Sequence, residues 1–135
     1  MKTAAFTAEK IHQIVYPPSN REVHPDLIRF QDAFYCQSQE RAGNRILRSR
    51  DGKHWETVQL GRVGFMFSIT PQGELMMINT WMRRPPQKAD GSWHWQTYTN
   101  FSADGLRWDL PCLFPAGFET CMFRVDWHGG VGYSV

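Results

Sequence analysis

The chain has 135 residues, the length of one ordinary domain, which is enough to bury a hydrophobic core. Its formal net charge of +2 is too small, and its basic residues are too scattered, to indicate a nucleic-acid or anionic membrane partner. Aromatic residues make up 14% of the chain, and six of them are Trp, which argues against disorder because so much apolar surface can be buried.

The sequence shows no segment typical of targeting or of membrane insertion. No apolar run approaches the ~20 residues that a membrane span needs, and the start MKTAAFTAEKIHQ lacks the apolar stretch of a secretory signal. The three cysteines, Cys36, Cys112 and Cys121, are odd in number and lack metal-site spacing, which favours reduced thiols. We therefore expect a cytoplasmic protein that needs neither a cofactor nor a metal.

Short β-rich runs separated by turn residues make up most of the chain, and only residues 7–15 show a weak helical period. The predicted strands, in chain order, are 26–30, 33–39, 45–49, 55–60, 65–70, 74–81, 94–102, 107–114, 122–128 and 131–135. Asp-Gly and Gly-Gly turns between such runs are typical of tight hairpins, because glycine accepts a positive φ. Since no βαβ rhythm is present, the sequence predicts an all-β antiparallel fold.

One seven-residue motif is written twice, as SRDGKHW at 49–55 and as SADGLRW at 102–108. The residues that the two copies share are Ser49, Asp51, Gly52 and Trp55 in the first, and Ser102, Asp104, Gly105 and Trp108 in the second. In each copy the aspartate can accept hydrogen bonds from its own turn, the glycine can take the left-handed conformation, and the tryptophan ring can be buried between sheets.

The motif is part of a larger repeat, in which hairpins precede and follow each copy. Four strands in a period of about 50 residues fit one blade of a β-propeller. We therefore expect residues 1–135 to form one partial propeller domain. Blade one is predicted at about 24–60, blade two at about 62–114 and the start of blade three at about 122–135.

The two motifs resemble a shortened form of the Asp-box, or BNR repeat, of bacterial sialidases and related propellers. HPDLIRFQDAFYCQSQE, RVGFMFSITPQGELMMIN and CMFRVDWHGGVGYSV are similar to the openings of the first, second and third blades of sialidase-like proteins. The resemblance covers roughly residues 11–135 and only the N-terminal portion of a typical member. It implies that the eight motif residues are structural, and that a ligand binds where the innermost strands begin.

Several residues near those strand beginnings are candidates for ligand binding: His24, Asp26, Glu40, Arg41, Arg62, Glu119 and Arg124. Sialidases hold the substrate carboxylate with arginines, whose planar fork suits that anion, so the resemblance implies anion contacts for Arg62 and Arg124. The alternative is that each is a surface arginine beside a strand end. A metal or acid/base cluster of His24, Asp26 and Glu40 is a further alternative, and so is a packed histidine with solvated or paired carboxylates.

Several catalytic positions of the family have no counterpart. Val23-His24-Pro25 stands where the first sialidase blade has Arg-Ile-Pro, and Asn44, which cannot transfer a proton, stands near the place of the acid/base aspartate. The tyrosine nucleophile of the family belongs to a late blade, so Tyr133 cannot be matched to it. The catalytic residues therefore stay unassigned, and sialidase chemistry by this chain alone is not expected.

Two functions remain open at this point. The first is a sialidase-like propeller segment, related to glycoside hydrolases or binding a carbohydrate ligand. The second is a non-catalytic module that uses its blades for protein–protein association. About two and a third blades would leave sheet faces bare, so we expect a dimer or trimer, or completion within a longer propeller.

Overall fold

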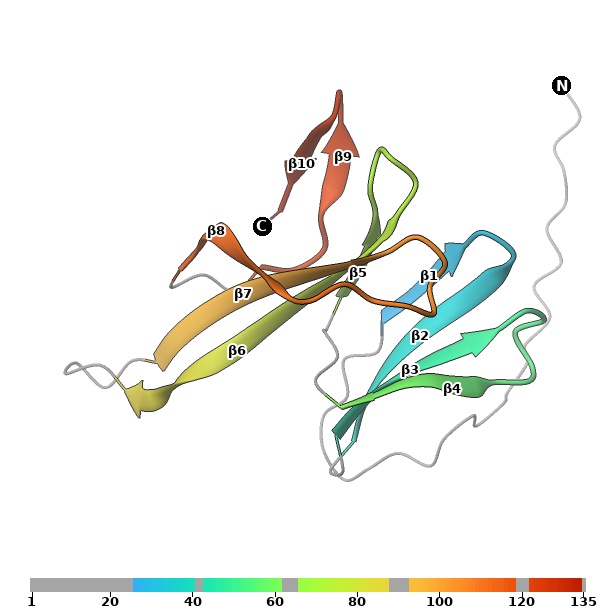
Figure 1. Cartoon of the computed structure of the whole chain (residues 1–135), viewed down its shortest axis with the longest axis horizontal. Coiled ribbons are helices and arrows are strands. Elements are labelled where there is room, and N and C mark those ends of the chain that lie inside the picture. Colours follow the sequence, from blue (N-terminus) through green and yellow to red (C-terminus); the bar gives the residue numbers. More distant parts are fainter. Residues whose placement is uncertain (1–25, 41–42, 62–65, 88–92, 119–121, 135) are drawn as a thin grey trace, which may run out of the picture.

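The structure, a computed structural model, describes the chain in five stretches. These stretches are residues 26–40, 43–61, 66–87, 93–118 and 122–134. Within them the chain forms antiparallel sheets of four, four and two strands, with no helix (Figure 1). The predicted all-β antiparallel class is thus confirmed, whereas the weak helical period at 7–15 lies outside the described residues.

The first sheet is a meander in which each strand pairs with the next along the chain. Its strands are β1 (Asp26–Phe30), β2 (Ala33–Glu40), β3 (Gly43–Ser49) and β4 (Glu56–Gly61). The β1–β2 turn has two residues, and Gln31 takes a φ of 53°, which is uncommon for a residue other than glycine. The first motif forms the connection between β3 and β4.

The second sheet repeats this order in a longer form. Its strands are β5 (Met66–Ile69), β6 (Leu75–Gln87), β7 (Trp93–Ser102) and β8 (Cys112–Phe118). The second motif follows β7, but the predicted strand 107–114 is wrong at its start, because pairing begins only at Cys112. Pro111 directly precedes that point and has no N–H to offer to a ladder.

The third sheet is a hairpin of β9 (Asp126–His128) and β10 (Val131–Tyr133). Its turn is Gly129–Gly130, and both glycines have a positive φ, as predicted for a tight two-residue turn. The predicted strand 122–128 is shorter than expected, because residues 122–125 do not pair as a strand.

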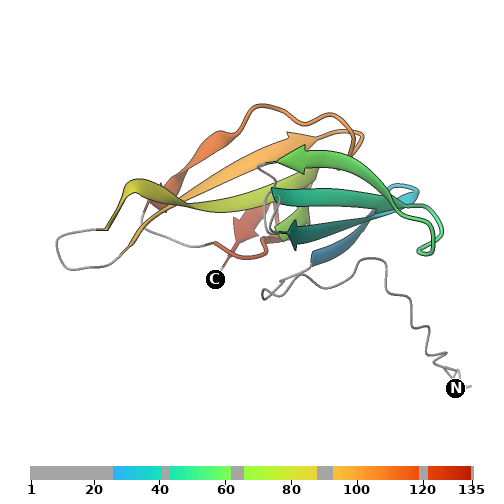
Figure 2. The same ribbon diagram turned by 90° about the horizontal axis from the view of Figure 1, so that it is seen from below.

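The second sheet lies between the first sheet and the β9–β10 hairpin, and Figure 2 shows the twist of the strands in both four-stranded sheets. Leu75 and Met77 of β6 pack toward the first sheet, whereas Met76 and Ile78 pack toward the hairpin. Alternate side chains of a strand point to opposite faces, so a strand that is buried on both faces needs a continuous apolar run. The run LMMI of β6 meets that need.

Two separate cores follow from this arrangement. The first is built from Phe30, Ala33, Tyr35 and Ile46 of the first sheet and Phe67, Leu75 and Met77 of the second. The second joins Met76 and Ile78 to Val125, with Met66, Phe101, Met122 and Trp127 packed around them. The three sheets therefore stack in chain order, each one covering a face of the next.

Candidate functional site

Two of the predicted ligand-binding residues, Asp26 and Arg124, meet beside the start of β1. Asp26 opens β1, and its Oδ1 accepts a hydrogen bond from Nη2 of Arg124 at 3.0 Å. Its Oδ2 accepts a second hydrogen bond, from the backbone N–H of Phe67 in β5, at 2.6 Å. The Asp26 side chain is only 12% exposed, whereas that of Arg124 is 48% exposed. A nearly buried carboxylate thus orients an accessible guanidinium.

The remaining candidates cannot be placed beside this pair. His24, Arg41, Arg62 and Glu119 lie outside the described residues. Glu40 ends β2, but its side chain lies outside the described part of the structure. In the part of the chain that the structure describes, no three His, Cys, Asp or Glu side chains are grouped as a metal would require.

Gln37 of β2 lies opposite Asp26 and is a buried polar residue that the sequence did not single out. It is the cross-strand partner of Asp26 and is fully buried. Neither polar atom of its side chain has a hydrogen-bond partner among the described residues. Burying an amide without hydrogen-bond partners costs about 1–3 kcal/mol of folding free energy. Packing alone therefore does not favour a glutamine at this position beside Asp26.

The two motif loops share one hydrogen-bond pattern. In the first, Oδ1 of Asp51 accepts from the backbone N–H groups of Lys53 and His54, both at 2.8 Å. Ser49 Oγ accepts from the N–H of Gly52 at 2.9 Å. Gly52 has a φ of 72°, so the predicted left-handed turn is present.

The second loop repeats each of these contacts. Oδ1 of Asp104 accepts from the N–H groups of Leu106 and Arg107, both at 2.8 Å, and Ser102 Oγ accepts from Gly105 at 2.8 Å. The φ of Gly105 is 73°. The serine and aspartate side chains of the two motifs therefore close their own turns.

These contacts also set the charge state of the aspartates. Hydrogen bonds to the carboxylate favour the ionised form. The backbone N–H of His54 is the largest cause that lowers the pKa of Asp51, followed by the bond from the His54 side chain. The N–H of Arg107, followed by that of Leu106, lowers the pKa of Asp104.

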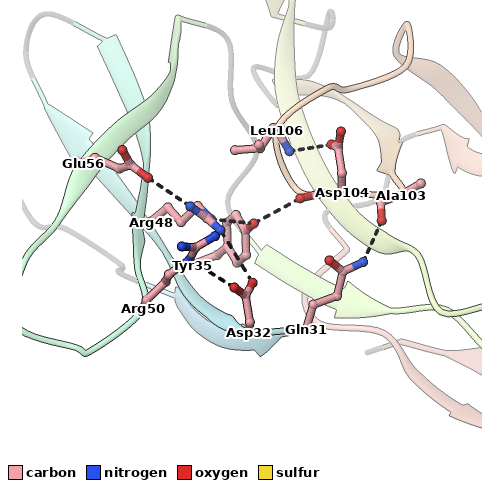
Figure 3. Close-up of polar contacts among 9 residues, drawn as sticks. All are labelled: Gln31, Asp32, Tyr35, Arg48, Arg50, Glu56, Ala103, Asp104 and Leu106. Atoms are coloured by element: carbon pink, nitrogen blue, oxygen red, sulfur yellow. Dashed lines mark hydrogen bonds and ion pairs between the residues drawn. The ribbon is translucent and has the colours of Figure 1, made fainter.

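The second loop differs from the first in that it is docked on the first sheet (Figure 3). The Tyr35 hydroxyl donates to the carbonyl of Asp104 at 3.2 Å, and Gln31 Nε2 donates to the carbonyl of Ala103 at 2.9 Å. A Cβ on Gly105 would overlap the Tyr35 phenol, so only glycine permits this approach. The contact connects residues that are 69 positions apart in the chain.

Arg48 also contacts the hydroxyl of Tyr35. Its Nε donates to the Tyr35 oxygen at 3.2 Å, and its guanidinium forms ion pairs with Glu56 at 3.1 Å and Asp32 at 3.5 Å. Arg50 pairs with the other oxygen of Asp32 at 3.0 Å. This network, drawn in Figure 3, fixes the phenol at the place where the second loop lands.

The first loop borders an open hollow of about 410 Å³. Its walls are Arg48, Ser49, Arg50, Asp51, His54, Trp55 and Glu56. The prediction that both motif tryptophans are buried between sheets is wrong for Trp55, which is partly buried and lines this hollow. Trp108 is also only partly buried, but it packs against the first core and stacks on Phe67 with ring centroids 6.4 Å apart.

The two cysteines in the described residues are both reduced. Cys36 and Cys112 are free thiols, and Cys121 lies outside the described residues. Burial, followed by the nearby Asp26 carboxylate, raises the pKa of the Cys36 thiol. A thiol with a raised pKa holds its proton and is a poor nucleophile, so Cys36 is not a candidate for covalent catalysis.

Comparison with protein families, with curated proteins and with solved structures finds no match to this chain.

Proposed function

We propose that this chain is a segment of a sialidase-like β-propeller that binds an acidic glycan without hydrolysing it. The observation that carries the proposal is the ion pair between Asp26, which opens β1, and Arg124, for which the resemblance implies an anion contact. The repetition of a four-stranded meander, with the same motif loop after its third strand, supports the propeller assignment.

The ligand chemistry follows from the state of Arg124. Among the described residues Asp26 is the acceptor of Arg124, and it uses one N–H group of a guanidinium that carries five donors and can also bind a carboxylate. A sialic acid presents such a planar anion, and a guanidinium that is already oriented loses less entropy on binding it. The partner of the site is therefore an acidic sugar, with Arg124 as the contact and Asp26 as the residue that positions it.

The same geometry argues against a catalytic role for Asp26. Both of its carboxylate oxygens already accept hydrogen bonds, one from a backbone N–H and one from a guanidinium. A general acid or base must face the substrate within hydrogen-bond reach, whereas both oxygens of Asp26 are engaged by donors of the chain itself. Binding without turnover is the expected behaviour.

Titration of sialyllactose into ¹⁵N-labelled protein tests the proposal. We expect shifts of the amide signals of Asp26, Phe67 and Arg124, and Arg124→Gln should weaken binding by about tenfold or more. Arg107→Gln is the matched control, because it removes the same charge from an exposed site in the second motif loop. Equal binding of neutral lactose, or unchanged affinity in Arg124→Gln, would show that this edge is not a carboxylate site.

Hydrolysis is measured separately with a fluorogenic sialoside. No release of the fluorophore above the rate in buffer is expected. Release that disappears in Arg124→Gln would instead assign a sialidase activity to this edge and overturn the non-catalytic part of the proposal.

The second candidate function is assembly with other protein chains through the sheet faces. The observation that favours it is the docking of the second motif loop on Tyr35, which shows how a motif loop and a hairpin fit together. This function does not require glycan binding, and the two can coexist in one molecule.

A further inference from the structure

The contact between Tyr35 and the second motif loop, called the template below, has the same parts as a possible contact between two copies of the chain. Tyr35 is the third residue of β2, after a two-residue turn that joins Phe30 to Ala33. Its side chain lies on the face of the first sheet that packs against the next sheet. There the hydroxyl meets the carbonyl of Asp104, and the ring lies against Gly105.

The β9–β10 hairpin places a tyrosine at the same position. Its two-residue turn joins His128 to Val131, so Tyr133 is the third residue of β10, as Tyr35 is of β2. Trp127 packs into the second core and a Cβ on Gly132 would contact its ring, so both lie on the face toward the second sheet. Tyr133 therefore lies on the opposite face and is 58% exposed.

The first motif loop presents the matching surface. It has the hydrogen bonds and the glycine φ of the docked loop, but no atom of the described residues lies within 4 Å of a Cβ built on Gly52. The hollow of about 410 Å³ beside this loop gives space for a phenol ring. The carbonyl of Asp51 stands where the docked loop has that of Asp104.

We infer that Tyr133 of one copy of this chain docks on residues 49–55 of a second copy and donates to the Asp51 carbonyl. The inference deepens the assembly candidate and is independent of glycan binding. Exposed apolar side chains on the two outer faces agree with it: Leu27 on the first sheet is 55% exposed, and Val131 on the third is 54% exposed. Exposed apolar side chains of this kind lose their contact with water when the two faces meet.

The geometry of the contact sets its symmetry and its strength. Because the tyrosine and the loop are different surfaces, the association is head to tail, and it continues until a ring closes. Gly129 stands where the template has Gln31, so the amide contact to a loop carbonyl has no counterpart. The association is therefore weaker than the internal contact and depends on concentration.

Sedimentation over a concentration series tests the inference with two variants. Tyr133→Ala removes the ring, and Gly52→Asn adds a side chain that tolerates the left-handed conformation but fills the docking position. Each should raise the dissociation constant by about tenfold or more, with an unchanged circular dichroism spectrum. Gly73→Asn is the control, because Gly73 also has a positive φ and open space around it but lies in the β5–β6 turn.

A mixture of the two variants distinguishes this contact from other modes of association. Tyr133→Ala retains the loop and Gly52→Asn retains the tyrosine. At a concentration where each variant alone is monomeric, the equimolar mixture should therefore form dimers and no larger species. Self-association that persists unchanged in Tyr133→Ala would overturn the inference and leave the assembly candidate standing. A wild-type chain that stays monomeric at every concentration would overturn both.

Discussion

At the scale of single residues, the two motif aspartates make the stability of the fold depend on pH. Hydrogen bonds from the backbone of His54 and of Arg107 lower the pKa of Asp51 and Asp104 in the folded chain. An unfolded aspartate has a pKa of about 3.9. Because the folded values lie below it, this contribution is complete above about pH 4 and is lost as the pH falls through the folded values.

Urea unfolding at pH 6 and at pH 3 measures this effect through the denaturation midpoint. We expect a lower midpoint at pH 3, and a smaller decrease in the double variant Asp51→Asn and Asp104→Asn. Asparagine keeps an acceptor oxygen for the turn but has no proton to gain, so its turn does not titrate. A decrease as steep as that of the wild type would show that other groups cause the acid sensitivity.

Removal of the same carboxylates should have unequal effects in the two loops. Asp51→Ala frees the N–H groups of Lys53 and His54, which are exposed and can bond to water. Asp104→Ala disturbs a loop that packs against Tyr35, so it should lower the melting temperature by a few degrees more than Asp51→Ala does. Thermal unfolding measures both. Sialyllactose binding should be unchanged, and a loss of binding without a change in melting temperature would contradict a structural role.

At the scale of elements, alanine variants of Gly105 and Gly52 can be compared to measure the contribution of the contact between Gly105 and Tyr35 to stability. Their φ values of 73° and 72° cause the same backbone strain in an alanine variant, about 1–2 kcal/mol. Only at Gly105 does the new Cβ also meet the Tyr35 ring. We therefore expect Gly105→Ala to reduce the free energy of unfolding by about 1–3 kcal/mol more than Gly52→Ala does. Equal losses in urea unfolding would mean that Tyr35 yields without cost.

The elements also show which parts of the fold local sequence chemistry determines. The hairpin at 26–39 and the turn at Gly129–Gly130 were predicted, because two-residue turns depend on residues that are adjacent in the chain. The prediction that β8 starts at residue 107 was wrong. Residues 107–111 have strand-like composition, but regular pairing with β7 begins only at Cys112, and Asp109 makes a single backbone hydrogen bond to Phe101. Composition reports a preference for extended backbone, whereas pairing depends on the neighbouring strand.

In the candidate site, too, some contacts could be predicted from the sequence and others depend on residues that are distant in the chain. The resemblance implied that Asp26 and Arg124 lie near one edge of the sheets. Their ion pair could be anticipated from the order of the strands alone. The docking of Gly105 on Tyr35 could not be predicted, because nothing local to either residue indicates the other. The buried Gln37 was missed for a similar reason: its polar side chain in a β-rich run is typical of an exposed position, and only the packed sheets bury it.

At the scale of the whole molecule, the three sheets are covered unequally. The second sheet has a neighbour on each face, and β6 contributes to both cores. The third sheet is a two-stranded hairpin that is covered on one face, and an isolated hairpin of this kind is marginally stable in water. The stability of the chain should therefore fall from the middle sheet toward β9 and β10.

Native-state hydrogen exchange of a dilute sample measures this order. The amides of β6 and β7 should exchange most slowly, by global unfolding, and those of β9 and β10 should exchange at least about a hundredfold faster, by local opening. If Tyr133 docks on a second copy, the β9 and β10 amides should gain protection as the concentration rises, while β6 stays unchanged. The Tyr133→Ala variant should lack that gain. Protection of β9 and β10 equal to that of β6 in a monomer would mean that the hairpin is held by more than the contacts of Trp127 and Val125.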